Sequence, residues 1–424
     1  LMAVAAQCDR EVWLDAPALC QPVQLGWISK RSSRTGDAVA FAYTDLWLTG
    51  AMGIAPFALD PDLPLVEGWQ YARRATSDVT AAFQDSSPDR WGRVLMDRRE
   101  AAQARADGRN IKSLRAWDYL LGVDDFSRMG ALRFRDPETD TWLAAGHPAA
   151  PPITDLRKLE SIAARVDAGD ALNRDEDVRW LVQLVVPGAS LGGARPKASY
   201  QDAAGTLWLA KFPGREDTHD VGLWEFITHG LALKAGINMP AASLLDLSSR
   251  GHTFAVQRFD RKSRARVHFA SAHTLLGAEQ SEGHSYLDLA HLIEDVGANG
   301  QIMQDLEQLF RRVIFNVLIA NRDDHLRNHG FLRSASGWAL SPAFDVNPNT
   351  ASGTHVLALD GGDPTPTTDH VLETAPYYQL SHARARVIHA EVRTAVGAWE
   401  TVARTNGAKR SDIDRMRAVI DPLR

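Results

Sequence analysis

The chain has 424 residues, which is too long for one small domain and predicts two or three. Hydrophobic residues make up 45% and charged residues 24%, so an ordinary core can form without a disulfide or a structural metal. The formal net charge of −6 argues against a chain that binds nucleic acid on its own. The two cysteines, Cys8 and Cys20, lack metal-ligand spacing and suit a reducing compartment. Because the sequence also has no signal-like start and no long apolar run, we expect a cytoplasmic protein.

Residues 1–143 are expected to form a first subdomain. Its predicted elements are strands at 23–28 and 38–43 and helices at 77–99 and 111–121. In the stretch 90–115, Arg and Glu alternate with Ala at helical spacing, which favours a solvated helix face over a nucleic-acid-binding patch. Residues 144–154 are rich in Pro, Gly and Ala, and we expect them to form a linker.

Residues 155–260 combine short β-like runs with helices. The predicted elements are helices at 155–168 and 221–235 and strands at 207–212 and 253–259. In the second helix, apolar residues recur mostly three or four positions apart, which is typical of a buried helix face.

Residues 261–424 are predicted to be mainly helical. The expected helices lie at 287–296, 302–319, 383–402 and 411–419. The second of these carries one apolar stripe and leads directly into a polar loop. The order of strands, one helix, a connector and then helices predicts an α+β, two-lobed protein-kinase-like fold. Its N-terminal lobe is strand-rich with an extra N-terminal subdomain, and its C-terminal lobe, 261–424, is all-helical.

The polar loop at 321–328 reads Asn-Arg-Asp-Asp-His-Leu-Arg-Asn, and it is the most informative part of the chain. Asp323 and Asn328 are separated by four residues, and Asp345 follows a short apolar strand. In protein kinases, one Asp meets the substrate hydroxyl, while an Asn and a later Asp hold Mg²⁺ through oxygen. The adjacent Asp324 makes the base ambiguous, and the spacing to Asn328 favours Asp323. A helix end followed by a polar turn would explain one carboxylate but not the ordered set.

Lys211 lies in an apolar run, where an unpaired ammonium group is costly to bury. Kinases place a phosphate-binding Lys on such a strand and often orient it with a Glu from the next helix. Glu225 is the candidate partner. The alternatives are that Lys211 points to water from an edge strand and that Glu225 has no part in the site.

Two further segments fit a nucleotide site. The glycine-rich stretch 187–197 could bring its backbone close to phosphates, although it matches neither known phosphate-loop pattern and could equally be a hairpin turn. At 256–261, a β-like run ends in a charged connector, as at the adenine-binding hinge of kinases. An ordinary strand end with surface charges explains the same residues.

These motifs together resemble the HipA-type serine/threonine kinase toxins of bacterial toxin–antitoxin systems. The resemblance covers most of the chain, and no single motif is decisive, but the motifs follow in the family's order. They are Phe-Gln-Asp-Ser-Ser-Pro-Asp-Arg at 83–90, Gly-Val-Asp-Asp-Phe-Ser-Arg-Met-Gly-Ala at 122–131, Ser-Leu-Gly-Gly-Ala-Arg-Pro-Lys at 190–197, Ala-Lys-Phe-Pro at 210–213, Gln-Arg-Phe-Asp-Arg at 257–261, Asp-x-His-x-x-Asn at 323–328 and Pro-Ala-Phe-Asp at 342–345.

The resemblance implies a role for individual residues. Ser190 corresponds to a loop serine whose autophosphorylation silences the enzyme, and Asp323 corresponds to the catalytic Asp, with Lys211 on the ATP phosphates. Asn328 and Asp345 correspond to the Mg²⁺ ligands. The ATP-binding set that the resemblance implies is Ser190, Leu191, Gly192, Gly193, Ala194, Lys197, Lys211, Gln257, Phe259, Asp260, His325, Asn328 and Asp345. Gln257 stands where the family commonly has Glu.

The implied activity is that of a Mg-ATP-dependent serine/threonine-protein kinase toxin that arrests growth. The best-known target class of the family is aminoacyl-tRNA synthetases, and the usual partner is a HipB-type helix-turn-helix antitoxin that supplies DNA binding. Two other functions remain open. One is a catalytically silent nucleotide-binding regulator in an antitoxin–DNA complex, against which the intact acidic set argues. The other is a kinase for a small molecule or a lipid.

Overall fold

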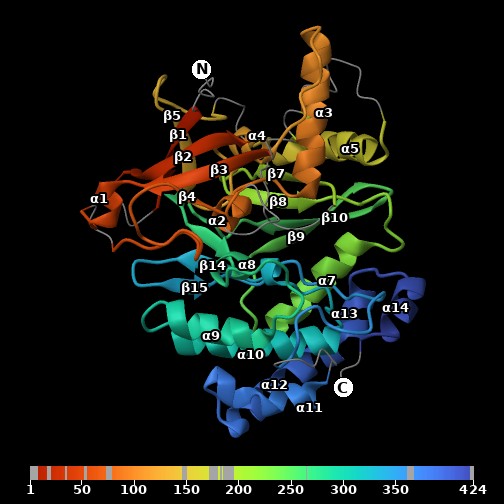
Figure 1. Cartoon of the computed structure of the whole chain (residues 1–424). Coiled ribbons are helices and arrows are strands. Elements are labelled where there is room, and N and C mark those ends of the chain that lie inside the picture. Colours follow the sequence, from red (N-terminus) through yellow and green to blue (C-terminus); the bar gives the residue numbers. More distant parts are fainter. Residues whose placement is uncertain are drawn as a thin grey trace. The chain divides into compact units, whose positions relative to one another are not determined.

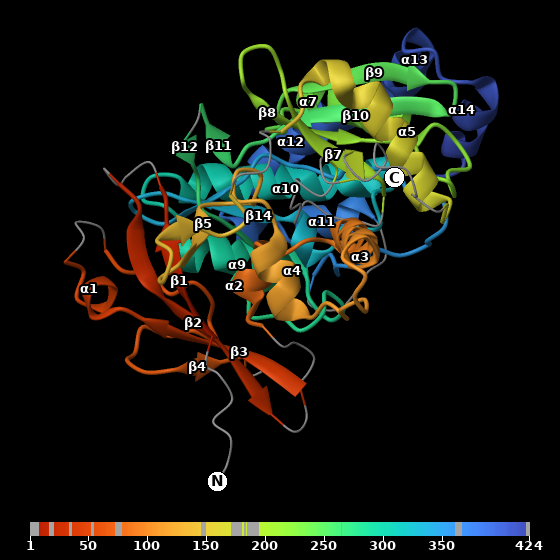
Figure 2. The ribbon, with the colours of Figure 1, turned by 90° about the horizontal axis from the view of Figure 1, so that it is seen from above.

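The computed structural model describes most of the chain, and Figures 1 and 2 label its elements. The described residues are 8–16, 21–33, 36–51, 55–72, 79–145, 150–170, 180–181, 184, 195–263, 265–360 and 367–420. The chain forms two compact units. The first comprises Leu1–Leu209 with Asp260–Ala270, and the second comprises Ala210–Phe259 with Ser271–Arg424. The predicted domain boundaries at 143, 154 and 260 stay predictions.

The first unit contains a six-stranded antiparallel sheet in the order β4-β3-β2-β1-β5-β6, with β1 to β4 side by side in red and orange (Figures 1 and 2). The strands are β1 (Cys8–Leu14), β2 (Val23–Ser33), β3 (Gly36–Tyr43), β4 (Gln70–Tyr71), β5 (Leu132–Asp136) and β6 (Thr141–Trp142). Val12 of β1 lies opposite Gly26 on one side and Phe134 on the other. A Cβ atom at Gly26 would lie 2.2 Å from the Ala42 carbonyl oxygen, so only glycine fits there.

The apolar side of this sheet packs on short helices. They are α1 (Asp45–Leu48), α2 (Ala81–Asp85) and α4 (Ala116–Gly122), while the longer α3 (Arg90–Ala106) contacts α4. Phe41, Phe83 and Phe134 meet in the core that results. The single helix predicted at 77–99 is wrong, because α2 ends before Pro88 and α3 begins after it. Proline disfavours helical backbone in the residue before it, and Asp89 starts α3 by accepting the Gly92 N–H at 2.8 Å.

The remaining described elements of the first unit follow the sheet in the chain. They are η1 (Ile153–Asp155), α5 (Leu156–Asp167), β7 (Lys197–Gln201), β8 (Leu207–Lys211), β11 (Arg261–Lys262), β12 (Ala265–Arg266) and the start of β13 (Phe269–Ser271). The helix predicted at 155–168 and the strand predicted at 207–212 are confirmed as α5 and β8. The boundary between the units falls inside β8, whose last residues, Ala210 and Lys211, belong to the second unit.

The second unit begins with a helix on an antiparallel strand pair. α7 (Val221–Lys234) contacts both β9 (Ala242–Ser248) and β10 (Gly251–Gln257), in which Val256 lies opposite Ala242. Asp220 starts α7 by accepting the Leu223 N–H. The helix predicted at 221–235 is confirmed, and the strand predicted at 253–259 is found two residues earlier, as β10.

The rest of the second unit is mainly helical. α9 (Tyr286–Val296), α10 (Ile302–Ile319) and α12 (His382–Gly397) pack together (Figure 1). They are accompanied by α8 (Ala272–Leu275), η2 (Leu326–Asn328), α11 (Thr368–Glu373), η3 (Ala375–Tyr378), α13 (Trp399–Thr405) and α14 (Arg410–Arg417). The hairpin of β14 (Gly330–Arg333) and β15 (Trp338–Leu340) interrupts the helices, so this part is not purely helical. The helix predicted at 383–402 is divided into α12 and α13 at Ala398.

α10 is the central helix of this unit. The predicted apolar stripe lies on it, and Leu306, Leu309, Val313 and Val317 are all fully buried. α10 ends where Ala320 adopts a left-handed conformation with φ of 59°, which turns the chain out of the helix and into the polar loop. Among the described residues, no helix is both long enough and apolar enough to cross a membrane.

Candidate active site

Lys211 meets two carboxylates in the second unit. Its ammonium Nζ pairs with Glu225 Oε1 of α7 and lies 2.8 Å from Asp345 Oδ1. Burial alone would lower the pKa of Lys211, but the negative charges of Asp345 and Glu225 outweigh it and raise the pKa above its ordinary value. Lys211 therefore stays protonated, and the pairing with Glu225 that the sequence left open is present.

The two adjacent aspartates of the polar loop have opposite environments. Asp324 is buried, and its Oδ2 accepts hydrogen bonds from Tyr286 Oη at 2.8 Å, Asn316 Nδ2 at 2.7 Å and His329 Nε2 at 2.8 Å. Burial raises the pKa of Asp324, yet the charge and hydrogen bond of His329 lead to a pKa below the ordinary range. Asp323 is exposed, and within the described residues no hydrogen bond to its carboxylate is present.

The environment of Asp323 suits a group that accepts a proton. Partial burial of the carboxylate raises its pKa, and the nearby charges of Asp345 and Asp324 raise it further, against the opposing charge of His325. Because Asp324 is engaged by three donors while Asp323 faces outward, the geometry favours Asp323 as the group that can reach a substrate. This agrees with the preference that spacing gave.

Asn328 and Asp345 have the oxygen atoms that Mg²⁺ prefers. Asn328 ends η2, and its Nδ2 lies 3.3 Å from the Asp323 carbonyl oxygen, while its Oδ1 is buried without a hydrogen-bond partner. A buried acceptor without a donor is costly unless something else binds it. Asp345 has an unusual positive φ of 56°, and its side chain is partly exposed. The unpaired carboxamide oxygen of Asn328 and the partly exposed carboxylate of Asp345 are oxygen ligands of the kind that a hard divalent cation prefers.

The residues predicted to form the hinge lie in different surroundings. Gln257 ends β10, and its N–H donates to the Ala241 carbonyl at 2.8 Å, so a backbone contact with adenine at this residue has to use the Gln257 carbonyl. The ring of Phe259 packs against the ring of Phe344, with 5.4 Å between centroids.

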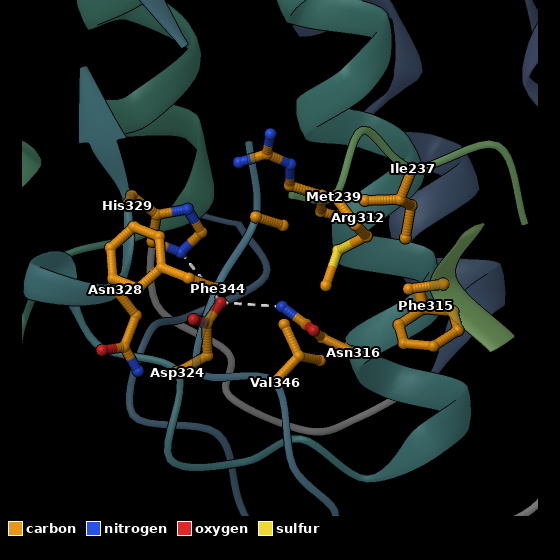
Figure 3. Close-up of a pocket in the computed structure, with 12 residues that line it drawn as sticks. Ile237, Met239, Arg312, Phe315, Asn316, Asp324, Asn328, His329, Phe344 and Val346 are labelled. Carbon is orange, nitrogen blue, oxygen red and sulfur yellow. Dashed lines mark hydrogen bonds and ion pairs between the residues drawn. The ribbon is translucent and has the colours of Figure 1, made fainter. Parts of the chain in front are cut away.

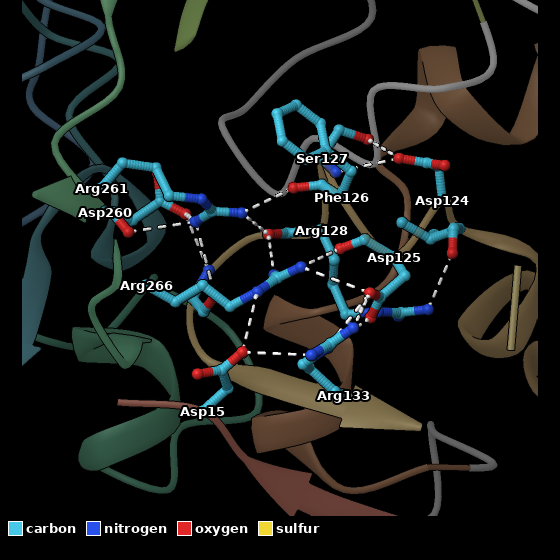
Figure 4. Close-up of polar contacts among 12 residues, drawn as sticks. Asp15, Asp124, Asp125, Phe126, Ser127, Arg128, Arg133, Asp260, Arg261 and Arg266 are labelled. Atoms are coloured by element: carbon cyan, nitrogen blue, oxygen red, sulfur yellow. Dashed lines mark hydrogen bonds and ion pairs between the residues drawn. The ribbon is translucent and has the colours of Figure 1, made fainter. Parts of the chain in front are cut away.

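Asp260, by contrast, lies within the first unit and is fully buried (Figure 4). Its carboxylate accepts the Gly130 N–H at 2.9 Å and pairs with Arg261. Figure 4 shows that this pair joins a larger network of buried Asp and Arg side chains that includes Asp125 and Arg266. The described contacts of Asp260 are therefore structural, and its predicted contact with a nucleotide stays a prediction.

The predicted phosphate loop is described only at its end. Ser190, Leu191, Gly192, Gly193 and Ala194 lie outside the described residues. Lys197 begins β7 in the first unit, is 2% exposed, and places its Nζ 2.5 Å from Asp89 Oδ2.

Several residues of the second unit that the sequence did not single out surround the loop. Figure 3 shows a small cavity where Asn316 and His329 point at Asp324, with Arg312 and Phe344 nearby. Arg312 and Asn316, like Arg311, are polar residues in the mostly apolar C-terminal half of α10, which was a visible signal of a buried polar role. Tyr286 carried no such signal, because its partner Asp324 is distant in sequence.

Comparison with known proteins identifies relatives of this chain. Residues 189–399 match the family model described as the HipA-like C-terminal domain. The chain is 27% identical over 279 residues to the toxin YjjJ of Escherichia coli, covering 61% of this chain and 56% of the relative. It is 24% identical over 225 residues to the serine/threonine-protein kinase toxin HipA of Shewanella oneidensis, covering 46% and 50%. The chain thus spans about half the length of these curated relatives.

A solved structure gives the fold. The HipA chain of Shewanella oneidensis, solved in complex with HipB and operator DNA, superposes with a TM-score of 0.61 at 15% identity. The superposition covers 98% of this chain and 95% of that chain. The α+β, kinase-like fold predicted from the sequence is confirmed.

Proposed function

The chain belongs to the HipA-type family, and on this premise we propose that it is a Mg-ATP-dependent serine/threonine-protein kinase toxin. The observation that carries the proposal is the gathering of Lys211, Glu225 and Asp345 within one unit, close enough to Asp323 for the charge of Asp345 to raise its pKa. A strand Lys oriented by a helix Glu, beside an exposed Asp, is the arrangement that phosphoryl transfer requires.

Each side chain has a role in that transfer. Asp323 orients the substrate hydroxyl and accepts its proton, and a raised pKa brings this carboxylate closer to the optimum of a general base. Lys211 stays charged between its carboxylates and binds the ATP phosphates, while Glu225 holds its ammonium group in place. Asn328 and Asp345 hold the metal. Mg²⁺, when bound, offsets the negative charge of the transferring phosphoryl group.

The nucleotide is held by three segments. The glycine-rich residues 190–194 bind the phosphates, His325 and Asn328 border them, and Gln257 with Phe259 binds the adenosine. Ser190 is the autophosphorylation site. A phosphate there carries about −1.5 to −2 charges and repels the phosphates of ATP, which switches the enzyme off.

The family supports our proposals for the substrate and the partner. The Shewanella relative was solved with HipB and operator DNA, and we propose that this chain likewise binds a HipB-type antitoxin, with DNA contacted through the antitoxin. Its substrate is a protein serine or threonine, with an aminoacyl-tRNA synthetase as the first candidate, and phosphorylation of that protein arrests growth.

The proposal is tested by Asp323→Asn, which removes the base and keeps the shape. We expect phosphate transfer from ATP to fall by about 10²–10⁴-fold while ATP still binds. The matched control is Asp414→Asn on α14, which makes the same chemical change at a surface ion pair. Transfer is measured on the protein itself and on host proteins by phosphoproteomics after induction. An unchanged rate in Asp323→Asn contradicts the proposed role, and binding of ATP without any transfer by the unchanged chain indicates a silent regulator instead.

A further inference from the structure

Three of the buried polar side chains of α10 lie along one face of the helix. Asp305, Arg312 and Asn316 are each only 4% exposed, and their spacings of seven and four place them along one face. Burying polar groups in a helix core is costly unless each is hydrogen-bonded. Each of these three side chains makes a hydrogen bond to a segment that leads to the candidate active site or forms part of it.

Asn316 uses both ends of its carboxamide on the polar loop. Its Nδ2 donates to Asp324 Oδ2 at 2.7 Å, and its Oδ1 accepts from Asn321 Nδ2 at 3.0 Å. The Asn316 carbonyl also accepts the Asn321 N–H at 2.9 Å. Figure 3 shows the bond from Asn316 to Asp324. Asn321 and Asp324 lie on either side of Asp323 in the sequence, so Asn316 holds the loop at both flanks of the proposed base.

Arg312 lies one helical turn earlier and holds a different segment. Its Nη2 donates to the Ser341 carbonyl at 2.5 Å, four residues before Asp345. Burial lowers the pKa of Arg312 to about 10, and the charges of Asp305 and Asp324 oppose this shift. The guanidinium group therefore remains charged at neutral pH. Asp305 completes the row by accepting the Leu340 N–H at 2.8 Å.

We infer that Asn316 and Arg312 are positioning residues that set the Asp323–Asn328 loop and the Asp345 segment at a fixed spacing. A helical turn of α10 has a fixed length, and both segments are hydrogen-bonded to side chains one turn apart on it. Neither residue touches the reacting groups. Their effect on catalysis comes from geometry, since small displacements of a catalytic group cost large factors in rate. This inference rests on the proposed kinase function.

The first test replaces Asn316 with Asp, which keeps the acceptor for Asn321 but places a second carboxylate against Asp324. We expect kcat to fall by about 10²-fold with KM for ATP changed less than about twofold, because the phosphate-binding Lys211 is untouched. The reciprocal double variant Asn316→Asp/Asp324→Asn again places an amide donor against a carboxylate acceptor, with the two positions exchanged. It should regain at least about tenfold in kcat. The matched control is Gln304→Glu, the same amide-to-acid change on the exposed side of α10.

The second test measures the backbone protection of residues 321–329 and 341–346 directly and does not depend on enzyme activity. Hydrogen–deuterium exchange of the full chain should become faster at 321–329 in Asn316→Asp and at 341–346 in Arg312→Lys, with little change in the other segment. Arg312→Lys keeps the positive charge but loses the planar guanidinium group, and we expect kcat to fall by about tenfold.

The outcomes separate the inference from the function on which it rests. If the unchanged chain transfers no phosphate, the proposed function is wrong, and the exchange pattern still decides whether Asn316 and Arg312 position the two segments. If exchange is unchanged, or if kcat falls only in proportion to lost folded protein, the positioning role is wrong. Failure of the double variant to regain activity also overturns it.

Discussion

Lys211 and Lys197 are two buried lysines with different surroundings, although the sequence predicted both to bind ATP. Lys211 pairs with Glu225 and Asp345, two carboxylates for one ammonium group, so the cluster carries a surplus negative charge. Lys197 pairs with Asp89, whose side chain is 9% exposed against 28% for Asp345. The Lys211 cluster therefore has excess negative charge and a partly exposed carboxylate, Asp345, and we call it the open cluster. Lys197 and Asp89 balance each other and their side chains are both largely buried, and we call them the closed pair.

The closed pair is part of the fold of the first unit. Asp89 also caps α3 through the Gly92 N–H, and Trp91 Nε1 donates to the Lys197 carbonyl at 3.1 Å. The ion pair thus ties the start of β7 to the start of α3. An open cluster can exchange a partner for a metal or a phosphate, and a closed pair cannot do so without leaving a buried charge uncompensated. The comparison therefore predicts a catalytic effect at Lys211 and a stability effect at Lys197.

The largest effect is expected from Lys211→Met. Removing the ammonium group deletes a phosphate contact and leaves Glu225 and Asp345 without their cation, so transfer should fall by at least about 10²–10³-fold. Steady-state transfer of phosphate from ATP measures the loss, and Lys234→Met at the exposed end of α7 is the matched control. If Lys211→Met loses stability but keeps its rate per folded molecule, the distinction between the two lysines fails.

The next effect is expected from Lys197→Met. Asp89 would be left buried without its cation, which should lower the free energy of unfolding of the first unit by about 3–5 kcal/mol. The double variant Lys197→Met/Asp89→Asn should recover part of the loss, because it removes the uncompensated charge. Thermal unfolding and ATP affinity are measured together. A loss of ATP affinity without a loss of stability would show that Lys197 binds the nucleotide, as the sequence resemblance implies.

The sequence predicted the order of the motifs and most helices, because these depend on local spacing. α10 and α7 were predicted correctly from apolar periodicity. The single helix predicted at 77–99 was wrong because Pro88 interrupts the helix despite the helix-forming residues around it. The Asp89–Lys197 pair joins residues 108 positions apart, so nothing local could separate Lys197 from Lys211. Asn316 was visible only as a polar residue in an apolar helix, and its partners depend on how the loop folds back.

The smallest expected effect is a change in Tm when Asp323 or Asp324 is replaced, and it compares these two aspartates as the two lysines were compared above. The pKa of Asp323 is raised in the folded chain, so its ionised form lowers stability at pH values above the folded pKa. Asp323→Asn should therefore raise Tm slightly at pH 7, although it lowers the rate of transfer by about 10²–10⁴-fold. The pKa of Asp324 is lowered, so its ionised form adds stability that is lost as pH falls, and Asp324→Asn should lower Tm at pH 7. Below about pH 3.9, the ordinary pKa of Asp, the gain in Asp323→Asn should disappear because the unchanged side chain is protonated in both states. Thermal unfolding at pH 7 and at low pH measures the change in Tm for each variant. A fall in Tm for Asp323→Asn at pH 7 would mean that Asp323 is a structural residue like Asp324.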